Sequence, residues 1–368
     1  MAPTVRALVF KKVPTDFPEV GEHLTVEDVP FDVSAPPPQD GIVVQVLYSS
    51  LDPYMRGRMR PPEVESYSPA FKTGEPIPAR SIVKVLQSSN SQFKEGDLVT
   101  GFFPVQEYAN APGDLFQART IKPLSNPFDI EDIRVFIGAL GMPGLTAYSS
   151  LYEIGKPKRG ETIFVSSASG AVGQIVGQLA KHEGLKVIGS VGSDDKLNYI
   201  LNDLGFDGGF NYKKEKPSDA LKRLAPQGID IYYENVGGEQ LEAALDALNP
   251  FGRIVTCGMI SQYNLPPEKQ YPIKNLTHLF RKRLEMRGFI VSDPDMGPKW
   301  AEQHQRNLGQ WIKDGSFKVL MDETAGIEHA AEALVGIFHG KNFGKAILRI
   351  QKVGLSPSPS KVYGNRVR

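Results

Sequence analysis

The spacing of apolar residues changes along this chain, and the change divides it into two parts. In the first part, short runs rich in β-branched residues occur at 41–52, 79–89 and 95–111, separated by turns rich in proline and glycine. Runs bounded by such turns are typical of strands. The segment 61–78 reads as a long surface loop. We therefore expect residues 1–132 to form a β-rich domain, either a barrel or a sandwich.

In the second part, helical and strand-like patterns alternate. Apolar residues at helical spacing cover 134–155, with an interruption at Gly141-Met-Pro-Gly144. Five short apolar runs follow, with one amphipathic segment between each run and the next, at 162–168, 186–192, 208–213, 229–237 and 253–260. Strands joined by single helices pair in parallel through right-handed crossovers. We therefore expect a doubly wound, Rossmann-type sheet over residues 133–324.

The last part of the chain mixes both patterns. Residues 275–293 read as a helix and then a strand, and residues 298–315 read as a long amphipathic helix. The segment 317–350 reads as strand, helix, strand, and we expect residues 325–355 to return to the first domain and complete it. Residues 356–368 are basic and rich in serine and proline, which predicts a flexible tail. The fold class expected is α/β with two domains.

Composition excludes several classes of function. The 368 residues contain 42 Lys and Arg and 42 Asp and Glu, and this zero net charge argues against general nucleic-acid binding. No apolar run approaches the ~20 residues that span a bilayer, and the amino terminus has no signal-peptide pattern. We therefore expect a soluble cytoplasmic protein with neither a nucleic-acid nor a membrane partner.

Disulfide and metal chemistry find little support in the sequence. Cys257 is the only cysteine, so an intrachain disulfide and a four-cysteine zinc site are both impossible. The six histidines show no close pairing such as His-Glu-x-x-His. We expect no metal centre, and we interpret Cys257 as a small buried apolar residue rather than a nucleophile.

The stretch ASGAVG, residues 168–173, is the first candidate for a ligand site. Its spacing is small-x-Gly-x-x-Gly, and it follows a predicted strand and opens a predicted helix. In this context Gly170 lets backbone N–H groups approach a pyrophosphate, and Gly173 lets the helix pack close to the sheet. Unpaired N–H groups and the helix dipole favour an anion at this position. The turn therefore predicts a dinucleotide cofactor.

The next strand indicates which dinucleotide binds. Sites for NAD usually carry an acidic residue at the tip of the second strand, where it binds the ribose hydroxyls. Here that strand ends in Gly192 and Ser193, and Asp194 and Asp195 fall in the first turn of the following helix, where acids are favoured. Lys196 comes directly after them and can reach a 2′-phosphate. We therefore expect NADP(H) rather than NAD(H).

At this point the chain resembles a known group of enzymes. Matching motifs occur in order along nearly the whole chain, and they include LDPYMRGRM (51–59), LGMPGLTAY (140–148), ENVGG (234–238), CGMISQYN (257–264) and GKNFGKAIL (340–348). They are similar to those of the zinc-independent medium-chain dehydrogenases/reductases. Within that superfamily, the chain resembles NADPH-dependent 2-alkenal double-bond reductases and leukotriene B4 12-hydroxydehydrogenase/prostaglandin reductases. The resemblance implies a GroES-like substrate domain beside the Rossmann domain, and a homodimer.

The resemblance also implies roles for particular residues. Residues 170–173 would hold the pyrophosphate, and Lys196 and Tyr212 would contact the adenosine 2′-phosphate. Residues that follow later strands would line the nicotinamide half, and Asn342 would reach the cofactor from the C-terminal return. The full set of implied cofactor residues is Met142, Thr146, Gly170, Ala171, Val172, Gly173, Lys196, Tyr212, Asn235, Cys257, Gly258, Met259, Ile260, Ser261, Tyr263, Phe289, Ile290, Val291 and Asn342.

The reaction that the resemblance implies is NADPH-dependent reduction of the C=C bond of an α,β-unsaturated aldehyde or ketone. Hydride would reach the β-carbon, and negative charge would develop on the carbonyl oxygen as an enolate, which needs a hydrogen-bond donor but no metal. Related members carry a tyrosine seven residues before the glycine of a Gly-Phe pair, and this chain has Arg281 there. Tyr54 and Tyr263 are therefore the candidate catalytic donors.

Two other functions stay open. One is an NADP-dependent dehydrogenase acting on an allylic or secondary alcohol, which the same family also implies. The other is a protein that binds NADPH without catalysis, as the lens crystallins of this superfamily do. The partner expected for the enzyme is a small unsaturated carbonyl compound, and the loop 61–78 carries no signature of a particular one.

Overall fold

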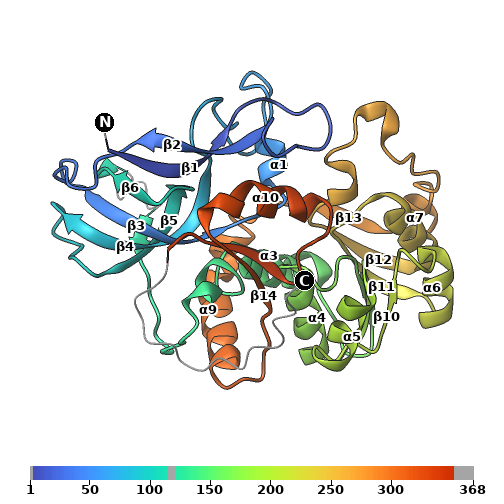
Figure 1. Ribbon diagram of the computed structural model, residues 1–368. Helices are drawn as coiled ribbons and strands as arrows, with labels where there is room; N and C mark the ends of the chain where they lie inside the picture. The colour runs from blue at the N-terminus through green and yellow to red at the C-terminus, as the bar shows by residue number, and fades with distance from the viewer. Residues whose placement is uncertain (1–2, 115–120, 352–368) are drawn as a thin grey trace.

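The computed structural model describes residues 3–114 and 121–351, and they form two lobes (Figure 1). The blue N-terminal strands and the red C-terminal segment share one lobe, and the green to yellow segment builds the other. Strands and helices contribute to both lobes, which confirms the α/β fold class. The tail predicted at 356–368 lies outside the described residues.

Two sheets form the N-terminal lobe. β1 (Thr4–Phe10) and β2 (Leu24–Pro30) pair antiparallel. The second sheet has seven strands in the order β14-β15-β3-β4-β5-β7, with β6 paired to β3 beside this path. Its strands are β3 (Ile42–Ser50), β4 (Pro78–Ser88), β5 (Leu98–Pro104), β6 (Tyr108–Ala111), β7 (Ile121–Pro123), β14 (Met321–Ala325) and β15 (Lys345–Arg349). Their inward apolar side chains form one core, which includes Phe10, Val44, Val83, Phe103 and Leu348.

The C-terminal segment belongs to this sheet. β15 pairs antiparallel with β3, with Ile347 opposite Ser50, and β14 pairs in parallel with β15. α10 (Ala330–Phe338) connects the two strands and packs against the same core. The return begins with β14 at Met321, whereas the sequence places its start at residue 325. The sequence of β14, MDETA, has few apolar residues, so the pattern does not fix the bounds of the strand predicted at the start of 317–350.

Six parallel strands form the second lobe, in the order β10-β9-β8-β11-β12-β13. They are β8 (Thr162–Val165), β9 (Lys186–Val191), β10 (Gly208–Asn211), β11 (Ile229–Glu234), β12 (Leu248–Thr256) and β13 (Glu285–Gly288). The helices between them are α4 (Gly173–His182), α5 (Asp194–Asn202), α6 (Pro217–Leu224) and α7 (Gly238–Ala247). The predicted doubly wound sheet is confirmed, and its strand order reverses between β8 and β11.

Two local predictions differ from the structure. β12 begins at Leu248 rather than at residue 253, because Pro250 has no N–H for a helix and disfavours a helical conformation at the residue before it. The helical pattern at 134–155 is divided into a 3₁₀ turn (Ile133–Ile137), α3 (Met142–Ser150) and a π-helical turn (Leu151–Gly155). At the start of α3, a Cβ built on Gly144 would lie 1.6 Å from the Ala139 carbonyl oxygen.

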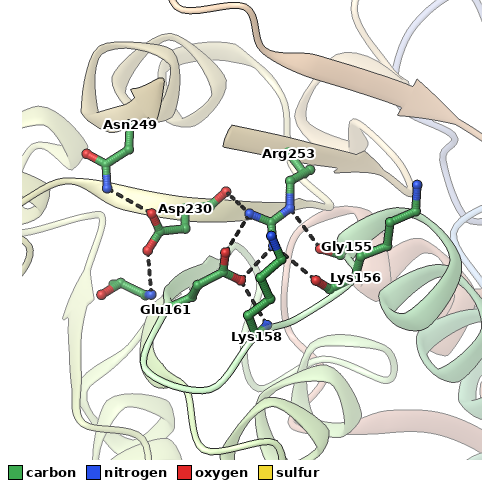
Figure 2. Close-up of polar contacts among 8 residues, drawn as sticks. Gly155, Lys156, Lys158, Glu161, Asp230, Asn249 and Arg253 are labelled. Carbon is green, nitrogen blue, oxygen red and sulfur yellow. Dashed lines mark hydrogen bonds and ion pairs between the residues drawn. The ribbon is translucent and has the colours of Figure 1, made fainter. Parts of the chain in front are cut away.

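A polar cluster joins the amino-terminal ends of the parallel strands, opposite the edge where ligands are expected (Figure 2). The Arg253 guanidinium donates to both carboxylate oxygens of Glu161, at 2.8 and 2.6 Å, and to the Gly155 carbonyl at 3.0 Å. Asp230 accepts the backbone N–H of Thr162 at 2.8 Å and the side-chain amide of Asn249 at 2.9 Å. These contacts fix β8, β11 and β12 to one another at this end of the sheet.

The remaining helices surround the two sheets. α9 (Gly297–Lys313) corresponds to the amphipathic helix predicted at 298–315, and it packs against α3. Two four-residue helices are α1 (Met55–Arg58) and α8 (His278–Arg281). Within residues 3–114 and 121–351, no helix has both the length and the apolar character that a membrane crossing requires.

Candidate active site

The glycine turn follows β8, at the point where the strand order reverses. Ser167 has a positive φ of 51°, and Gly170 donates its N–H to the Ser167 carbonyl at 2.9 Å. The chain therefore folds back tightly before α4, where Ala171 and Val172 directly precede Gly173. A Cβ built on Gly173 would lie 2.3 Å from the Ser167 carbonyl oxygen. A larger residue at 173 would therefore push the start of α4 away from the turn.

The tip of β9 is where the sequence predicts the 2′-phosphate. The Ser193 hydroxyl accepts the N–H of Lys196 at 3.3 Å and caps α5. Tyr212 lies beside the tip, because a Cβ built on Gly192 would be 3.0 Å from the Tyr212 hydroxyl. The Lys196 ammonium donates to the carbonyl of Gly340 at 2.7 Å. The structure therefore brings α5, the end of β10 and the C-terminal return together at this point.

Asn235 connects the two central strands where the order reverses. Its backbone N–H donates to the Ser166 hydroxyl oxygen at 2.9 Å, and its side-chain amide donates to the Ser166 carbonyl at 2.7 Å. Ser166 follows β8 and Asn235 follows β11, so both lie at the carboxyl ends where such sheets bind ligands. Asn235 therefore supports the turn as well as lying at the predicted cofactor position.

The loop after β12 packs on the turn after β11. Ile260 donates its N–H to the Asn235 carbonyl at 3.1 Å, and the Tyr263 hydroxyl oxygen accepts the N–H of Met259 at 3.1 Å. Burial raises the pKa of Tyr263 to about 12 and the pKa of the Cys257 thiol to about 12. Both groups are therefore protonated at neutral pH, which agrees with the interpretation of Cys257 as an apolar residue.

A contact between the lobes ties the segment of Tyr54 to the segment of Tyr263. The Arg56 guanidinium donates through Nε to the side-chain oxygen of Asn264 at 2.7 Å and through Nη2 to the Asp16 carbonyl at 2.9 Å. Arg56 is therefore a bridge between the lobes rather than a free surface charge. Burial, followed by the nearby negative charge of Asp52, raises the pKa of Tyr54, so its phenol is also protonated.

Tyr67 belongs to the same neighbourhood, although no motif pointed to it. It lies in the predicted loop 61–78 and is 61% exposed. Burial of its hydroxyl raises the pKa of Tyr67, and this hydroxyl in turn affects the pKa values of Tyr54 and Tyr263. Such responses fall off with distance, so the three tyrosines are neighbours. The only signal available in the sequence was an aromatic residue in a polar loop.

Glu234 is a second residue that the sequence left without a role. It ends β11 and is fully buried, and its Oε1 accepts the N–H groups of Val236 at 2.6 Å and Gly237 at 2.8 Å. The Tyr232 hydroxyl donates to the same oxygen at 2.9 Å. Among the described residues, Oε2 has no hydrogen-bond partner. Burial raises the pKa of Glu234 to about 7, although the hydrogen bonds to Oε1 oppose this shift.

The other residues named from the sequence lie in three places. Met142 and Thr146 lie one turn apart on α3, and the Thr146 hydroxyl donates to the Met142 sulfur at 3.4 Å. Phe289, Ile290 and Val291 directly follow β13. The Asn342 amide donates to the Gly344 carbonyl at 2.8 Å. Arg281, which stands where related members have a tyrosine, is exposed at the end of α8, with its guanidinium 6.0 Å from the Phe280 ring centroid.

These features fit a phosphorylated dinucleotide. The absence of a Cβ at Gly173 lets α4 start directly at the turn, where its unpaired N–H groups favour a pyrophosphate. Lys196 and Tyr212 lie together at the tip of the neighbouring strand, where a 2′-phosphate would lie. Individual contacts of the 19 residues with the cofactor stay predictions. Within the described ranges, no group of three or more His, Cys, Asp or Glu side chains could hold a metal ion.

Comparison with protein families supports this assignment. A sequence profile of the family described as "Zinc-binding dehydrogenase" matches residues 171–305, and a profile described as "N-terminal domain of oxidoreductase" matches residues 6–118. The NADP-dependent oxidoreductase RED1 of Cochliobolus heterostrophus is 50% identical over 345 residues, which cover 94% of this chain and 97% of that protein. The NADP(+)-dependent 2-alkenal reductase of Nicotiana tabacum is 42% identical over 353 residues. The match covers 94% of this chain and 98% of that protein.

Comparison with a solved structure supports the same family and cofactor. The crystal structure of CurA from Vibrio vulnificus in complex with NADPH superposes with a TM-score of 0.84 at 32% sequence identity. The match covers 95% of this chain and 100% of CurA. The chain therefore belongs to the zinc-independent branch of the medium-chain dehydrogenase/reductase family, and it is an oxidoreductase that uses NADP(H).

Proposed function

We propose that this protein reduces the C=C bond of α,β-unsaturated aldehydes or ketones with NADPH. The observation that carries the proposal is the state of Tyr263. Its hydroxyl oxygen accepts the Met259 N–H, and its pKa of about 12 keeps the phenol protonated, so the O–H remains available to another acceptor. The similarity to the tobacco 2-alkenal reductase supports the same reaction class.

In this reaction the protein must stabilise the negative charge that develops on the carbonyl oxygen of the substrate. When bound, NADPH supplies the hydride that goes to the β-carbon. The charge that then develops on the carbonyl oxygen needs a donor already in place, because a fixed donor stabilises the enolate without reorganisation. Tyr263 provides this donor, since the hydrogen bond from Met259 fixes its hydroxyl. The Arg56–Asn264 contact holds the adjacent residue against the N-terminal lobe.

Tyr54 is the second candidate for this task. Its phenol is protonated, and it follows Pro53 directly before α1, in a segment tied to Tyr263 by the Arg56–Asn264 contact. Tyr54 would either donate to the carbonyl oxygen or line the substrate. Substitution of each tyrosine by phenylalanine distinguishes these roles, because the change removes only the hydroxyl.

The test combines product identity with these variants. The full-length protein with NADPH and an enone should yield the saturated ketone, and with 4-deuterated NADPH the deuterium should appear on the β-carbon by NMR. Tyr263→Phe should lower kcat about 100-fold with little change in NADPH affinity. Tyr271→Phe is the matched control, because the Tyr271 hydroxyl bonds to Glu242 outside the site.

Other outcomes favour the alternatives. An allylic alcohol as product, together with oxidation of allylic alcohols by NADP⁺, would favour the dehydrogenase. Tight NADPH binding without turnover over a broad panel of enals, enones and quinones would favour the non-catalytic protein. Homodimeric assembly and a cytoplasmic location stay predictions.

A further inference from the structure

Two acidic residues, Asp194 and Asp195, directly precede the lysine expected to bind the 2′-phosphate. Asp194 opens α5 two residues before Lys196, and its negative charge would repel a phosphate unless it is compensated. Both of its carboxylate oxygens are occupied. Oδ1 accepts the side-chain amide of Asn211 at 2.9 Å, and Oδ2 accepts the ammonium of Lys214. Both donors come from the end of β10 and the turn that follows it.

Several backbone contacts fix this turn, residues 211–214, to the tip of β9. The side chain of Asn211 is buried, and its Oδ1 accepts the N–H of Lys213 at 3.1 Å. Tyr212 donates its N–H to the Val191 carbonyl at 3.1 Å, and Lys214 donates its N–H to the Asn211 carbonyl at 2.9 Å. The two donors to Asp194 are therefore held by the same strand end that carries Tyr212.

The same turn places a second positive charge near Lys196. Burial and then the like charge of Lys213 lower the pKa of Lys196. Two neighbouring ammonium groups repel each other, and an anion between them relieves the repulsion. At the tip of β9, the positive charges of Lys196 and Lys213 thus repel each other, while the Asp194 carboxylate is paired with a third lysine, Lys214.

We propose that the turn 211–214 determines the preference for NADP(H) over NAD(H), with Lys214 as the positioning residue. Lys214 does not contact the phosphate; it holds the Asp194 carboxylate and compensates its charge. Without Lys214, Asp194 is free to repel a 2′-phosphate and to accept a hydrogen bond from an unphosphorylated ribose, as acids near this position do in NAD sites.

The experiment measures binding rather than turnover, so it does not depend on the proposed reaction. The full-length protein is titrated calorimetrically with 2′,5′-ADP and with 5′-AMP, which differ only in the 2′-phosphate. Lys214→Ala should weaken 2′,5′-ADP about 3- to 10-fold, as expected for a partly screened charge, and should leave 5′-AMP unchanged or tighter. Lys216→Ala removes an equal charge nearby and should change the 2′,5′-ADP affinity less than 2-fold. Lys196→Ala is the positive control for loss of the phosphate contact.

The same substitution in an Asp194→Asn variant tests whether Lys214 acts through the Asp194 carboxylate. When Asp194→Asn is already present, Lys214→Ala should change the 2′,5′-ADP affinity by less than about 2-fold, because no carboxylate is left to compensate. An unchanged affinity in Lys214→Ala alone would overturn the proposal. So would an equal loss in both backgrounds, since Lys214 would then act on the phosphate directly. Thermal unfolding of each variant confirms that these exposed substitutions leave the fold intact.

Discussion

The ammonium of Lys345 lies 3.3 Å from a carboxylate oxygen of Asp52, and both side chains are almost completely excluded from solvent. The same ammonium donates to the carbonyls of Leu51 at 2.6 Å and Ala346 at 2.7 Å, and the Ser50 hydroxyl donates to Asp52 at 2.5 Å. The pair therefore ties β15, which comes from the C-terminal return, to the segment that leads into Tyr54.

Replacement of Lys345 by methionine should destabilise the protein strongly. The change leaves the Asp52 carboxylate buried without its counter-ion, and breaking a buried pair in this way costs about 3–5 kcal/mol. Urea unfolding monitored by circular dichroism measures this loss. The double variant Asp52→Asn/Lys345→Met removes both charges and should recover part of it. If the stability loss of the double variant equalled the sum of the losses in the two single variants, the pairing would be contradicted.

Addition of one methyl group at Gly173 should weaken cofactor binding. In Gly173→Ala the new Cβ meets the Ser167 carbonyl, and relieving an overpacked contact of this kind costs about 1–3 kcal/mol, which corresponds to a 5- to 150-fold loss if it falls on the bound state. Fluorescence titration with NADPH measures it. Gly288→Ala is the matched control, because a Cβ built there meets nothing within 4 Å. Equal affinity in the two variants would exclude a special role for Gly173.

Glu234 should make stability depend on pH near neutrality. Burial raises the pKa of Glu234 from its usual 4.5 to about 7, so between these pH values the folded state holds a proton that the unfolded state has lost. The contribution of this group to stability is therefore complete below pH 4.5 and is lost as the pH rises through 7. Glu234→Gln should flatten the slope of unfolding free energy between pH 5 and 7. An unchanged slope would show that the group does not titrate there.

The polar cluster around Arg253 should contribute to stability and leave the cofactor site untouched. Arg253→Met removes the guanidinium that donates to both oxygens of the Glu161 carboxylate. Because the pair is largely buried, we expect the free energy of unfolding to fall by roughly 3 kcal/mol. Arg253→Lys keeps the positive charge but cannot donate two parallel hydrogen bonds to the Glu161 carboxylate, so it should lose less stability than Arg253→Met. Because the cluster lies at the opposite ends of the strands, NADPH affinity should stay the same in both variants, and a large change would indicate that the two ends are coupled.

The doubly wound sheet could be predicted because its signals are local. Each strand is a short apolar run, each connecting helix has its own apolar face, and the glycine spacing at 168–173 sits at a strand–helix junction. The pattern of 317–350 predicts a strand before its helix, but the bounds of β14 could not be predicted, because its residues are half-buried and mostly polar. Its place in the sheet depends on β15, which lies beyond α10 in the chain.

The candidate site was predictable in part for the same reason. Lys196 and Tyr212 follow recognisable strands, so their approach to each other follows from the topology. The bridge from Arg56 to Asn264 joins residues 208 positions apart, and nothing in either motif specifies the partner of the other. Likewise, the sequence does not show that Asp194 pairs with Lys214, because the two residues meet only through the turn after β10.

The hydrogen bond from Lys196 to the Gly340 carbonyl has a consequence for how the two lobes respond to their ligand. Gly340 belongs to the C-terminal return and Lys196 to the Rossmann lobe, so the bond is one of the links between them. An ammonium has three N–H donors, so a 2′-phosphate can bind Lys196 while the bond to the Gly340 carbonyl stays in place. A bound cofactor would then be anchored through one lysine to both lobes at once.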